Sequence, residues 1–359
     1  MLIDHDSLIR FVTEIFVRLQ TDPDDAANVA RHLVAANLKG HDSHGVGMVP
    51  AYVGNIRSGA LTVDAHARLV HDKGAVLLID GQMGFGQVVG SEAAAMAIER
   101  VKDTGIVCAG VRNCHHLGRI GSYGEQCGNA GYVSVHFVNV VGHGALVSPF
   151  GGRERRISTN PFCCVVPRPG AAPVVLDMAT SAIAQGKVRV AHMKGEAVAE
   201  GALVDHEGLP TNDPAVMFSE PLGALGPFGK HKGYGLALMC ELLGGGLAGE
   251  WTAQAPPPER FSIVNHMLML VLDPDLFGGA DKFHSEVEEM VTYLHSTTPA
   301  SGFDRVRIPG EPEIESVAER TANGIPIDDN SWAGIVKSAE VVGMSGSEIA
   351  GYIDASAFS

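Results

Sequence analysis

Two histidine-rich segments carry the residue types best suited to acid–base chemistry. The first is His41-Asp42-Ser43-His44 and the second is Asn113-Cys114-His115-His116, and both have the composition of turns with glycine close by. Imidazole titrates near neutral pH, so a histidine that projects into a cleft can donate or accept a proton. The same residues could instead be core or surface histidines satisfied by their neighbours. The pattern therefore makes both segments candidates for a proton-transfer site.

A metal site is an alternative for these histidines, with His41, His44, His116 and His143 as ligands. The sequence has no HExxH motif and no His-x-His pair to supply the usual ligand spacing. The side chains of adjacent residues such as His115 and His116 also tend to point apart. We therefore expect no bound metal.

Ser43 beside His44 looks like a nucleophile pair, but sequence neighbours seldom reach the geometry of a catalytic triad. We predict instead that Ser43 caps a helix or stabilises a turn. The sequence contains neither the GxSxG turn of serine hydrolases nor the GxxxxGK[ST] phosphate loop. Those two enzyme classes are excluded.

Charged residues also stand where strands or helices are expected to begin or end. Leu176–Ser181 places Asp177 at a strand end, where we favour a helix N-cap by Asp177 or Thr180 over a ligand contact. Lys187 follows this segment. His231-Lys232-Gly233 precedes an apolar helix, where cations either meet a phosphate or carboxylate or simply face solvent.

Neither glycine-rich stretch fits the dinucleotide-binding fingerprint. Gly84-Phe85-Gly86 follows an apolar run, but Val89 stands where the third glycine belongs. Gly244–Gly249 matches GxGxxG literally, yet it ends an apolar helix and follows no strand. A nicotinamide cofactor would therefore not be held in a Rossmann crevice.

The composition limits the class of protein and its partners. The chain has 359 residues, of which 45% are hydrophobic and 19% charged, and a formal net charge of −15. This predicts a large globule whose acidic surface repels phosphate backbones and anionic lipid. No apolar run is long enough to span a bilayer, the first residues lack a secretory signal, and the six cysteines form no CxxC pair. We predict a cytoplasmic protein that binds neither nucleic acid nor membrane.

Helical periodicity marks both ends of the chain. Helices are predicted over 8–19, from Asp22-Pro23 to Gly40, and over 50–56. Amphipathic helices over 316–323, 331–342 and 347–353 need a partner surface, which the N-terminal helices offer. We predict a helical subdomain of residues 1–66 completed by residues 314–359.

The intervening residues 67–313 predict an α/β (α+β) domain. Apolar runs at 67–72 and 75–80 form an antiparallel hairpin around Lys73-Gly74. Further strands are predicted at 105–111, 132–138, 162–167, 174–178 and 261–272, and helices at 91–102, 122–129, 233–247 and 282–294.

Six motifs follow one another along the chain: Gly40-His41-Asp42-Ser43-His44-Gly45-Val46, Asn113-Cys114-His115-His116-Leu117-Gly118, Thr159-Asn160-Pro161, Leu176–Ser181 with Gly186-Lys187, His231-Lys232-Gly233-Tyr234 and Pro309-Gly310-Glu311. Together they resemble the malate/L-lactate dehydrogenase family of non-Rossmann nicotinamide oxidoreductases, over nearly the whole chain. The details look most like its hydroxycarboxylate dehydrogenase B branch, which reduces 2-oxo acids such as phenylpyruvate, hydroxyphenylpyruvate and 2-oxoglutarate.

The resemblance implies a role for each matching residue. His116 would be the general acid/base, and His44 with Ser43 would lie over the nicotinamide and substrate. NAD or NADP would be lined by His44, Gly118, Arg119, Ile120, Val175, Leu176, Asp177, Met178, Ala179, His231, Gly310, Glu311, Pro312 and Glu313. The implied fold is a largely antiparallel sheet flanked by helices, with a helical subdomain from both chain ends. The implied assembly is a homodimer.

One departure from the family concerns the substrate carboxylate. Many members carry an arginine at the position of Met48, where it can grip a carboxylate in bidentate fashion. Here Arg119, Lys187 or Lys232 must supply the cation, or the carboxylate is bound more weakly. We therefore expect a 2-oxo acid with a bulky side chain rather than malate or lactate.

The expected function is that of an NAD(P)-dependent 2-hydroxycarboxylate dehydrogenase. Alternatives within the family are a malate, lactate or ureidoglycolate dehydrogenase and a cyclic-imine carboxylate reductase. Outside it, a metal-dependent hydrolase and a cofactor-binding sensor without turnover stay open.

Overall fold

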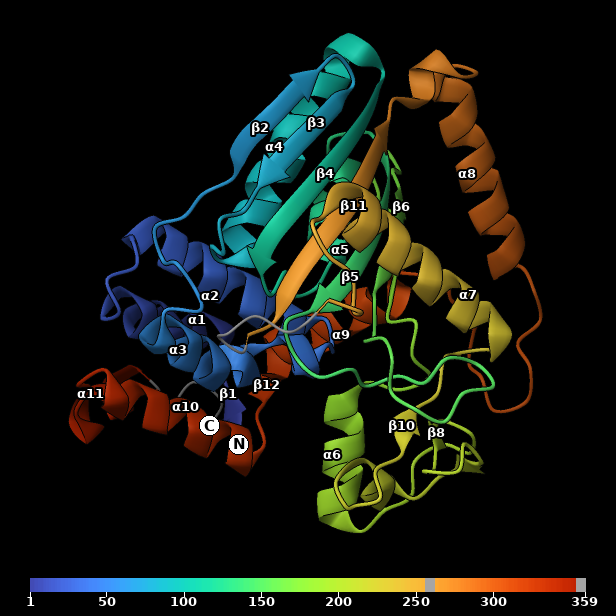
Figure 1. Ribbon diagram of the computed structural model, residues 1–359. Coiled ribbons are helices and arrows are strands. Elements are labelled where there is room, and N and C mark those ends of the chain that lie inside the picture. The colour runs from blue at the N-terminus through green and yellow to red at the C-terminus, as the bar shows by residue number, and fades with distance from the viewer. Residues whose placement is uncertain (256–261, 353–359) are drawn as a thin grey trace.

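A seven-stranded sheet in the order β2-β3-β4-β11-β5-β6-β7 forms the centre of the computed structural model (Figure 1), which describes residues 1–255 and 262–352. Its strands are β2 (Arg68–Lys73), β3 (Val76–Asp80), β4 (Ile106–His115), β5 (Val133–Val141), β6 (Phe162–Val166), β7 (Val174–Met178) and β11 (Val264–Leu272). All the strands predicted from the sequence are present. The first residue predicted for the last of them, Phe261, lies outside the described residues.

Antiparallel pairing dominates this sheet, as predicted. Only β3 and β4 pair in parallel, because α4 (Gly86–Thr104) connects them as a crossover helix. The remaining neighbours, from β2–β3 to β6–β7, are antiparallel. The non-Rossmann fold is therefore confirmed, with one parallel pair that the hairpin pattern did not reveal.

Helices cover both faces of the sheet. Since successive strand residues point to opposite faces, Ala109 and Gly110 of β4 meet different layers. Ala109 joins the core beneath α4 and α5 (Gly121–Asn129). A Cβ at Gly110 would lie 3.1 Å from the Cβ of Ala248, which belongs to η4 (Glu241–Ala248) on the other face. η4 is a π-helical continuation of α7 (His231–Cys240), so the single helix predicted over 233–247 changes its winding at Glu241.

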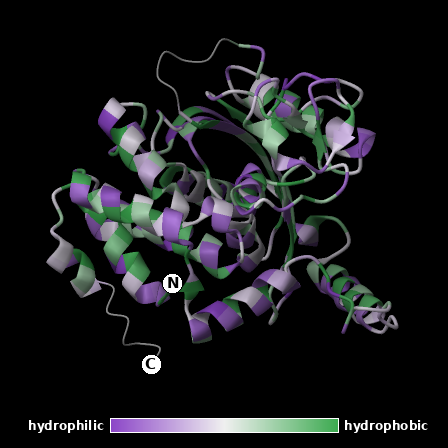
Figure 2. Cartoon of the chain, turned by 90° about the horizontal axis from the view of Figure 1, so that it is seen from below, coloured by the Kyte–Doolittle hydropathy of each residue, from purple (hydrophilic) through white to green (hydrophobic). Residues whose placement is uncertain are grey.

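The helices of both chain ends share one hydrophobic core, which confirms the predicted helical subdomain. This core takes side chains from α1 (His5–Val17), α2 (Pro23–Leu38), α3 (Val49–Ser58), α10 (Asp329–Val341) and α11 (Gly346–Tyr352). α9 (Glu311–Asn323) has no fully buried residue and joins α2 through the Ser316 hydroxyl, which donates to the Leu38 carbonyl oxygen at 2.8 Å. β1 (Leu2–Ile3) pairs with β12 (Ile325–Pro326), and the N-terminal amine donates to the Ile327 carbonyl oxygen. Figure 2 shows hydrophobic and hydrophilic residues mixed along these helices, as amphipathic helices require. The boundaries at residues 66 and 313 stay predictions, and residues 353–359 of the predicted tail lie outside the described ranges.

A smaller unit with its own core lies beside the sheet (Figure 1). It contains α6 (Gln185–Lys194) and a sheet of β8 (Leu203–Val204), β9 (Pro210–Thr211) and β10 (Ala224–Leu225). Its strands have only two residues each, too few for a clear alternation of apolar and polar residues in the sequence, so this unit was not predicted. α8 (Ala280–His295) borders the sheet on another side. Within residues 1–255 and 262–352, no helix is long and apolar enough to cross a membrane.

Candidate active site

His116 lies directly after β4, where the helical subdomain meets the central sheet. The residue is only 8% exposed. Its backbone packs against the first turn of α4, where a Cβ at Gly86 would lie 2.3 Å from the His116 carbonyl oxygen. β4 continues through His115, so this histidine pair ends a strand and does not lie in the turn that its composition suggested.

A chain of buried hydrogen bonds holds the His116 ring at its Nδ1 atom. The Tyr52 hydroxyl on α3 lies 2.8 Å from His116 Nδ1, and Gln87 Nε2 donates to the same hydroxyl at 2.7 Å. Tyr52 and Gln87 are 0% and 1% exposed, so neither bond competes with bulk water. No residue in the described part of the chain hydrogen-bonds to the other ring nitrogen, Nε2. Nε2 is therefore the atom left for a substrate.

Burial sets the protonation state of His116. Desolvation is the main cause that lowers its pKa well below the ordinary value, and the charges of His44, His115 and His143 act in the same direction. The ring is therefore neutral at pH 7 in the free protein. A neutral imidazole can accept a proton, and an oxyanion formed beside it favours its charged form.

The second histidine segment brings His44 onto His116. The two rings stack with centroids 5.5 Å apart and planes 25° apart. Ser43 Oγ lies 2.9 Å from His44 Nδ1, so the two neighbouring side chains hydrogen-bond to each other. Ser43 lies in a 3-10 turn (η1, Asp42–His44), and its side chain bonds to His44 instead of capping a helix. Burial lowers the pKa of His44, opposed by the charge of Asp177.

Residues from both chain ends hold this turn in place. Asn37 Nδ2 donates to Asp42 Oδ1 at 2.7 Å, while Asn37 Oδ1 accepts from the Val46 amide at 2.8 Å. Arg320 of α9 donates to the Asp42 carboxylate at 2.6 and 3.1 Å. The position of His44 therefore depends on the C-terminal part of the chain.

Arg119 lies at the centre of a buried charge network. Its side chain is 3% exposed, and its guanidinium contacts Glu125 at 2.9 Å and Asp177 at 3.6 Å, while Lys39, the residue after α2, pairs with the same Glu125. Burial opposes the charge of Arg119, but Glu125 and Asp177 outweigh it and raise the Arg119 pKa. Burial also opposes the Glu125 charge, and Arg119 and Lys39 hold the Glu125 pKa below its ordinary value. The two cations and two anions balance each other.

The predicted N-caps at Asp177 and Thr180 are wrong. Asp177 lies in β7, and its carboxylate accepts from the Gly121 amide at 2.7 Å, which joins β7 to the start of α5. Thr180 donates to the backbone oxygens of Thr159 and Asn160 at 3.0 and 2.9 Å. Both side chains connect segments far apart in sequence, which helix-cap statistics cannot anticipate.

The structure brings together three of the expected cofactor segments. Residues 118–120 meet 175–179 because Arg119 pairs with Asp177 at 3.6 Å, and 175–179 meet 310–313 because a Cβ at Gly310 would lie 3.2 Å from the Val175 nitrogen. Glu313 lies 3.2 Å from His41, beside the His44 turn. The side chain of Ile120 is buried in the core, so this residue can offer only its backbone.

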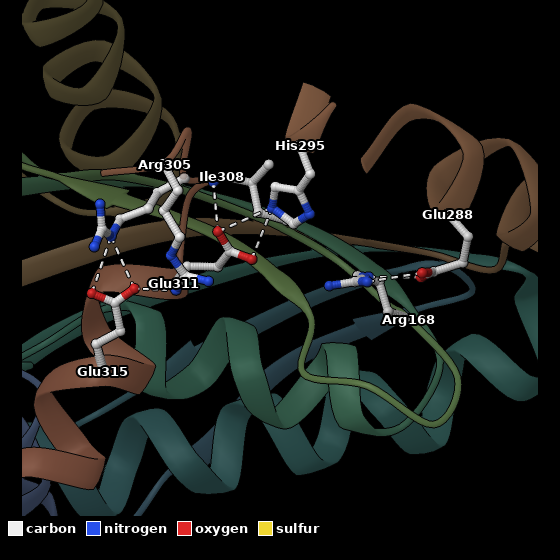
Figure 3. Close-up of polar contacts among 8 residues, drawn as sticks. Arg168, Glu288, His295, Arg305, Ile308, Glu311 and Glu315 are labelled. Atoms are coloured by element: carbon white, nitrogen blue, oxygen red, sulfur yellow. Dashed lines mark hydrogen bonds and ion pairs between the residues drawn. The ribbon is translucent and has the colours of Figure 1, made fainter. Parts of the chain in front are cut away.

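Figure 3 shows how the 310–313 segment is anchored. The Glu311 carboxylate accepts from the Ile308 amide at 3.0 Å and lies 3.0 Å from His295 Nε2 at the end of α8. Arg168 pairs with Glu288 of α8 at 2.6 Å, and Arg305 pairs with Glu315 of α9. Glu311 therefore orders this segment through its side chain.

The remaining predicted residues lie further apart. His231 begins α7, with its ring 5.9 Å from that of Phe150, and no described contact joins it to His44 or His116. Lys232 is exposed on the same helix. Lys187 is exposed on α6, next to Gly186, whose Cβ position would lie 3.4 Å from the Ser43 Cβ. Met48 packs against the core of the helical subdomain.

The polar groups of this site fit a nicotinamide dinucleotide better than a metal ion. Arg119 Nη1 is buried and has no hydrogen-bond partner in the described residues, so it can donate to an anionic phosphate. Gly118 has φ +69°, a backbone conformation that glycine adopts without steric cost, and a Cβ there would lie 3.0 Å from Gln87 Nε2. Residues 1–255 and 262–352 contain no group of three or more His, Cys, Asp or Glu that could hold a metal ion. The proposed ligands His41, His44, His116 and His143 thus gain no support as a metal site.

Three supporting residues escaped the sequence analysis. Tyr52 and Gln87 were hidden because both occupy buried positions of helices, where a polar side chain resembles core packing. Asn265 Oδ1 accepts from the Leu117 amide at 2.8 Å and so fixes the backbone next to His116. Asn265 could have been noticed in the sequence, because an asparagine within a strand of apolar residues needs a buried hydrogen-bond partner.

Known proteins resemble this chain in sequence and fold. The family model for malate/L-lactate dehydrogenase matches residues 3–336. Hydroxycarboxylate dehydrogenase B of Escherichia coli (strain K12) is 44% identical and covers 95% of this chain and 94% of its own length. L-lactate dehydrogenase of Cupriavidus necator is 40% identical, covering 95% and 97%. Delta(1)-pyrroline-2-carboxylate/delta(1)-piperideine-2-carboxylate reductase of Pseudomonas syringae pv. tomato is 33% identical, covering 90% and 92%.

A solved structure agrees with these relatives. An Escherichia coli protein assigned as a malate/lactate dehydrogenase superposes with a TM-score of 0.93 at 43% identity over 98% of each chain. Fold and site thus define an oxidoreductase of hydroxy acids that does not use a Rossmann crevice. The chain belongs to the malate/L-lactate dehydrogenase family, and this membership implies a nicotinamide cofactor.

The contact between Gly86 and His116 predicts a cost for any side chain at position 86. We expect Gly86→Ala to lower the free energy of unfolding by about 1–3 kcal/mol, because the added Cβ overlaps backbone atoms that cannot move aside. Gly54→Ala is the control, since its Cβ would meet nothing within 4 Å on α3 and should stabilise the protein by about 0.5–1 kcal/mol. Thermal unfolding of both variants measures the difference. Equal stability of the two would contradict the packing described here.

Proposed function

We propose that the chain is an NAD(P)-dependent 2-hydroxycarboxylate dehydrogenase that also runs as a 2-oxo acid reductase, with His116 as the general acid/base. The observation that supports this most is the buried His116 ring, held at Nδ1 by Tyr52 and free at Nε2, with His44 stacked beside it. The names of the relatives support a hydroxy acid as substrate.

The cofactor would lie along residues 118–120, 175–179 and 310–313, with His44 and His231 as further contacts. When bound, a nicotinamide supplies or accepts the hydride. Arg119 offers its buried donor to an anionic group, while Glu125 and Asp177 hold the guanidinium in place. His116 Nε2 gives a proton to the carbonyl oxygen in reduction and takes it back from the hydroxyl in oxidation. The stacked His44 shields this exchange from water.

The substrate we propose is a 2-oxo acid with a bulky side chain, of the phenylpyruvate, hydroxyphenylpyruvate or 2-oxoglutarate class. Met48 has no charge and packs into the helical core, so the carboxylate needs another cation. Arg119 is already neutralised by two carboxylates. Lys187 follows Gly186, which lies against Ser43, and is therefore the best placed of the three candidate cations.

A second candidate function is reduction of a cyclic imine carboxylate. The 33% identical reductase of Pseudomonas syringae supports it, because that relative covers nearly the whole chain. Malate, lactate and ureidoglycolate stay further alternatives. These reactions share the cofactor, so the substrate profile separates them.

We also propose a homodimer in the cytoplasm. Met239, Leu242 and Leu247 on α7 and η4 are 42%, 48% and 67% exposed, which leaves an apolar stripe that a second copy can cover. The six free cysteines support a reducing compartment.

Loss of reduced-nicotinamide absorbance tests the reaction. We expect the protein to oxidise NADH or NADPH with phenylpyruvate faster than with pyruvate or oxaloacetate, and His116→Ala to lower kcat by roughly 10²–10⁴-fold. Replacing His71, which is exposed on β2, should leave the rate unchanged. Turnover only with a cyclic imine or ureidoglycolate would select the alternatives, and an active His116→Ala enzyme would refute the assigned role.

The carboxylate proposal predicts an effect on KM. We expect Lys187→Met to raise KM for the 2-oxo acid by about tenfold or more, because a charge-assisted hydrogen bond to the carboxylate is lost. KM for the cofactor should not change. Lys232→Met is the matched control on α7. A larger effect in Lys232→Met than in Lys187→Met would assign the carboxylate to α7.

The apolar stripe predicts the mass in solution. Light scattering coupled to size exclusion should give twice the 37.7 kDa of the chain. Leu242→Glu should shift the population toward the monomer, because it places a charge within the stripe. A wild-type monomer at micromolar concentration would contradict the dimer.

A further inference from the structure

The Tyr52 hydroxyl is the only described group that bonds to His116 Nδ1, and its own hydrogen bonds restrict what it can do there. Gln87 Nε2 donates to the hydroxyl oxygen at 2.7 Å, and the hydroxyl lies 3.4 Å from the His116 carbonyl oxygen, to which it can donate. If the hydroxyl proton goes to that carbonyl, the second lone pair of the oxygen is left to accept a proton from Nδ1, 2.8 Å away.

The opposite arrangement, with Tyr52 donating to Nδ1, conflicts with acid–base chemistry at Nε2. A neutral ring that accepts at Nδ1 carries its proton on Nε2, so it has no lone pair for a substrate hydroxyl. If it gave that proton away, the ring would become an anion unless Tyr52 supplied another proton. Burial raises the pKa of Tyr52, so the tyrosine keeps its proton.

We propose that Tyr52 is a positioning residue that keeps His116 protonated at Nδ1, so that Nε2 alone exchanges a proton with the substrate. This inference rests on the proposed function for its kinetic consequence, but not for the tautomer itself. In oxidation the substrate O–H bond breaks and an Nε2–H bond forms, while the hydride goes to the nicotinamide and Nδ1–H is unchanged. In reduction the same Nε2 proton returns to the oxygen. Gln87 holds the Tyr52 oxygen toward the ring throughout.

The tautomer of His116 can be measured without substrate. In protein labelled with ¹⁵N-histidine, long-range ¹H–¹⁵N spectra distinguish a protonated ring nitrogen from an unprotonated one, and the His116→Asn spectrum identifies the signals of this ring. We expect wild type to show a proton on Nδ1 and none on Nε2. Tyr52→Phe removes the acceptor and should move the proton to Nε2. A wild-type ring protonated at Nε2 overturns the proposal, and this measurement needs no variant to fold.

Tyr123→Phe is a matched control for the loss of a buried hydroxyl. Tyr123 is 0% exposed and donates to the Leu117 and Gly86 backbone oxygens, but it does not contact the His116 ring. We expect both variants to lose stability, while only Tyr52→Phe changes the tautomer. A changed tautomer in Tyr123→Phe would mean that general loosening of the core is responsible, which overturns the specific role of Tyr52.

Kinetics give a second, separable readout. We expect Tyr52→Phe to lower kcat for oxidation by at least about tenfold with little change in KM, and by less than His116→Ala does. The groups that face His116 are His44, His115, His143 and Tyr52. Since a lost acceptor at Nδ1 destabilises the charged ring, the rise of kcat/KM with pH should move to lower pH in Tyr52→Phe and stay in place in Tyr123→Phe.

The two readouts separate failure of this inference from failure of the proposed function. If wild type turns over substrate and needs His116, but Tyr52→Phe keeps its kcat and pH profile, the positioning role is refuted and the function stands. If no substrate is turned over while the tautomer is as expected and depends on Tyr52, the proposed function fails and the positioning of His116 stands.

Discussion

The buried contact between Tyr52 and His116 is the interaction on which the site depends. Tyr52 comes from the helical subdomain and His116 from the end of a central strand, so the contact forms only when these two parts pack together. Because both residues are nearly inaccessible to water, their hydrogen bond has no competing solvent partner. The close approach of Gly86 and the hydrogen bond that the Leu117 amide donates to Asn265 Oδ1 then fix the backbone around the histidine. The His116 ring is thereby held in one orientation.

The charge network around Arg119 performs a related task for the segments proposed to bind the cofactor. A lone buried guanidinium would be costly, but Glu125 and Asp177 compensate its charge, and Lys39 also pairs with Glu125. Each member comes from a different segment, so the network orients α2, α5, β7 and the turn after His116 relative to each other. Within this balanced set the Nε and Nη1 atoms of Arg119 make no hydrogen bond to the described residues. A site for an anion can therefore be rigid and polar without carrying a large net charge.

Much of the architecture could be predicted from the sequence, because it follows from periodicity. The hairpin, the strands and the amphipathic helices at both ends all appear where apolar spacing placed them. Three features were not predicted: the parallel pair β3–β4, the change to π-helical winding at Glu241 and the small sheet. Each depends on tertiary packing or on strands of two residues.

The candidate site could likewise be predicted from the sequence only in part. His44 and His116 stood out by residue type and do lie together, and the family motifs named segments that the structure brings side by side. The partners of these residues could not be found in this way. Tyr52, Gln87 and Asn37 act through contacts between distant segments, and a single sequence does not reveal those contacts. Asp177 was misread as a helix cap for the same reason, because its partner Gly121 lies on another element.

The shared core of the two chain ends has a consequence for biosynthesis. α1, α2 and α3 are synthesised before α10 and α11, yet their apolar faces are covered partly by these two later helices. Arg320, which holds the Asp42 turn, is also synthesised long after that turn. The apolar faces of α1, α2 and α3 therefore stay exposed on the nascent chain until α10 and α11 have been made, and such exposed surface is prone to aggregate or to bind a chaperone. The turn that carries His44 likewise gains its last support only once Arg320 has been added.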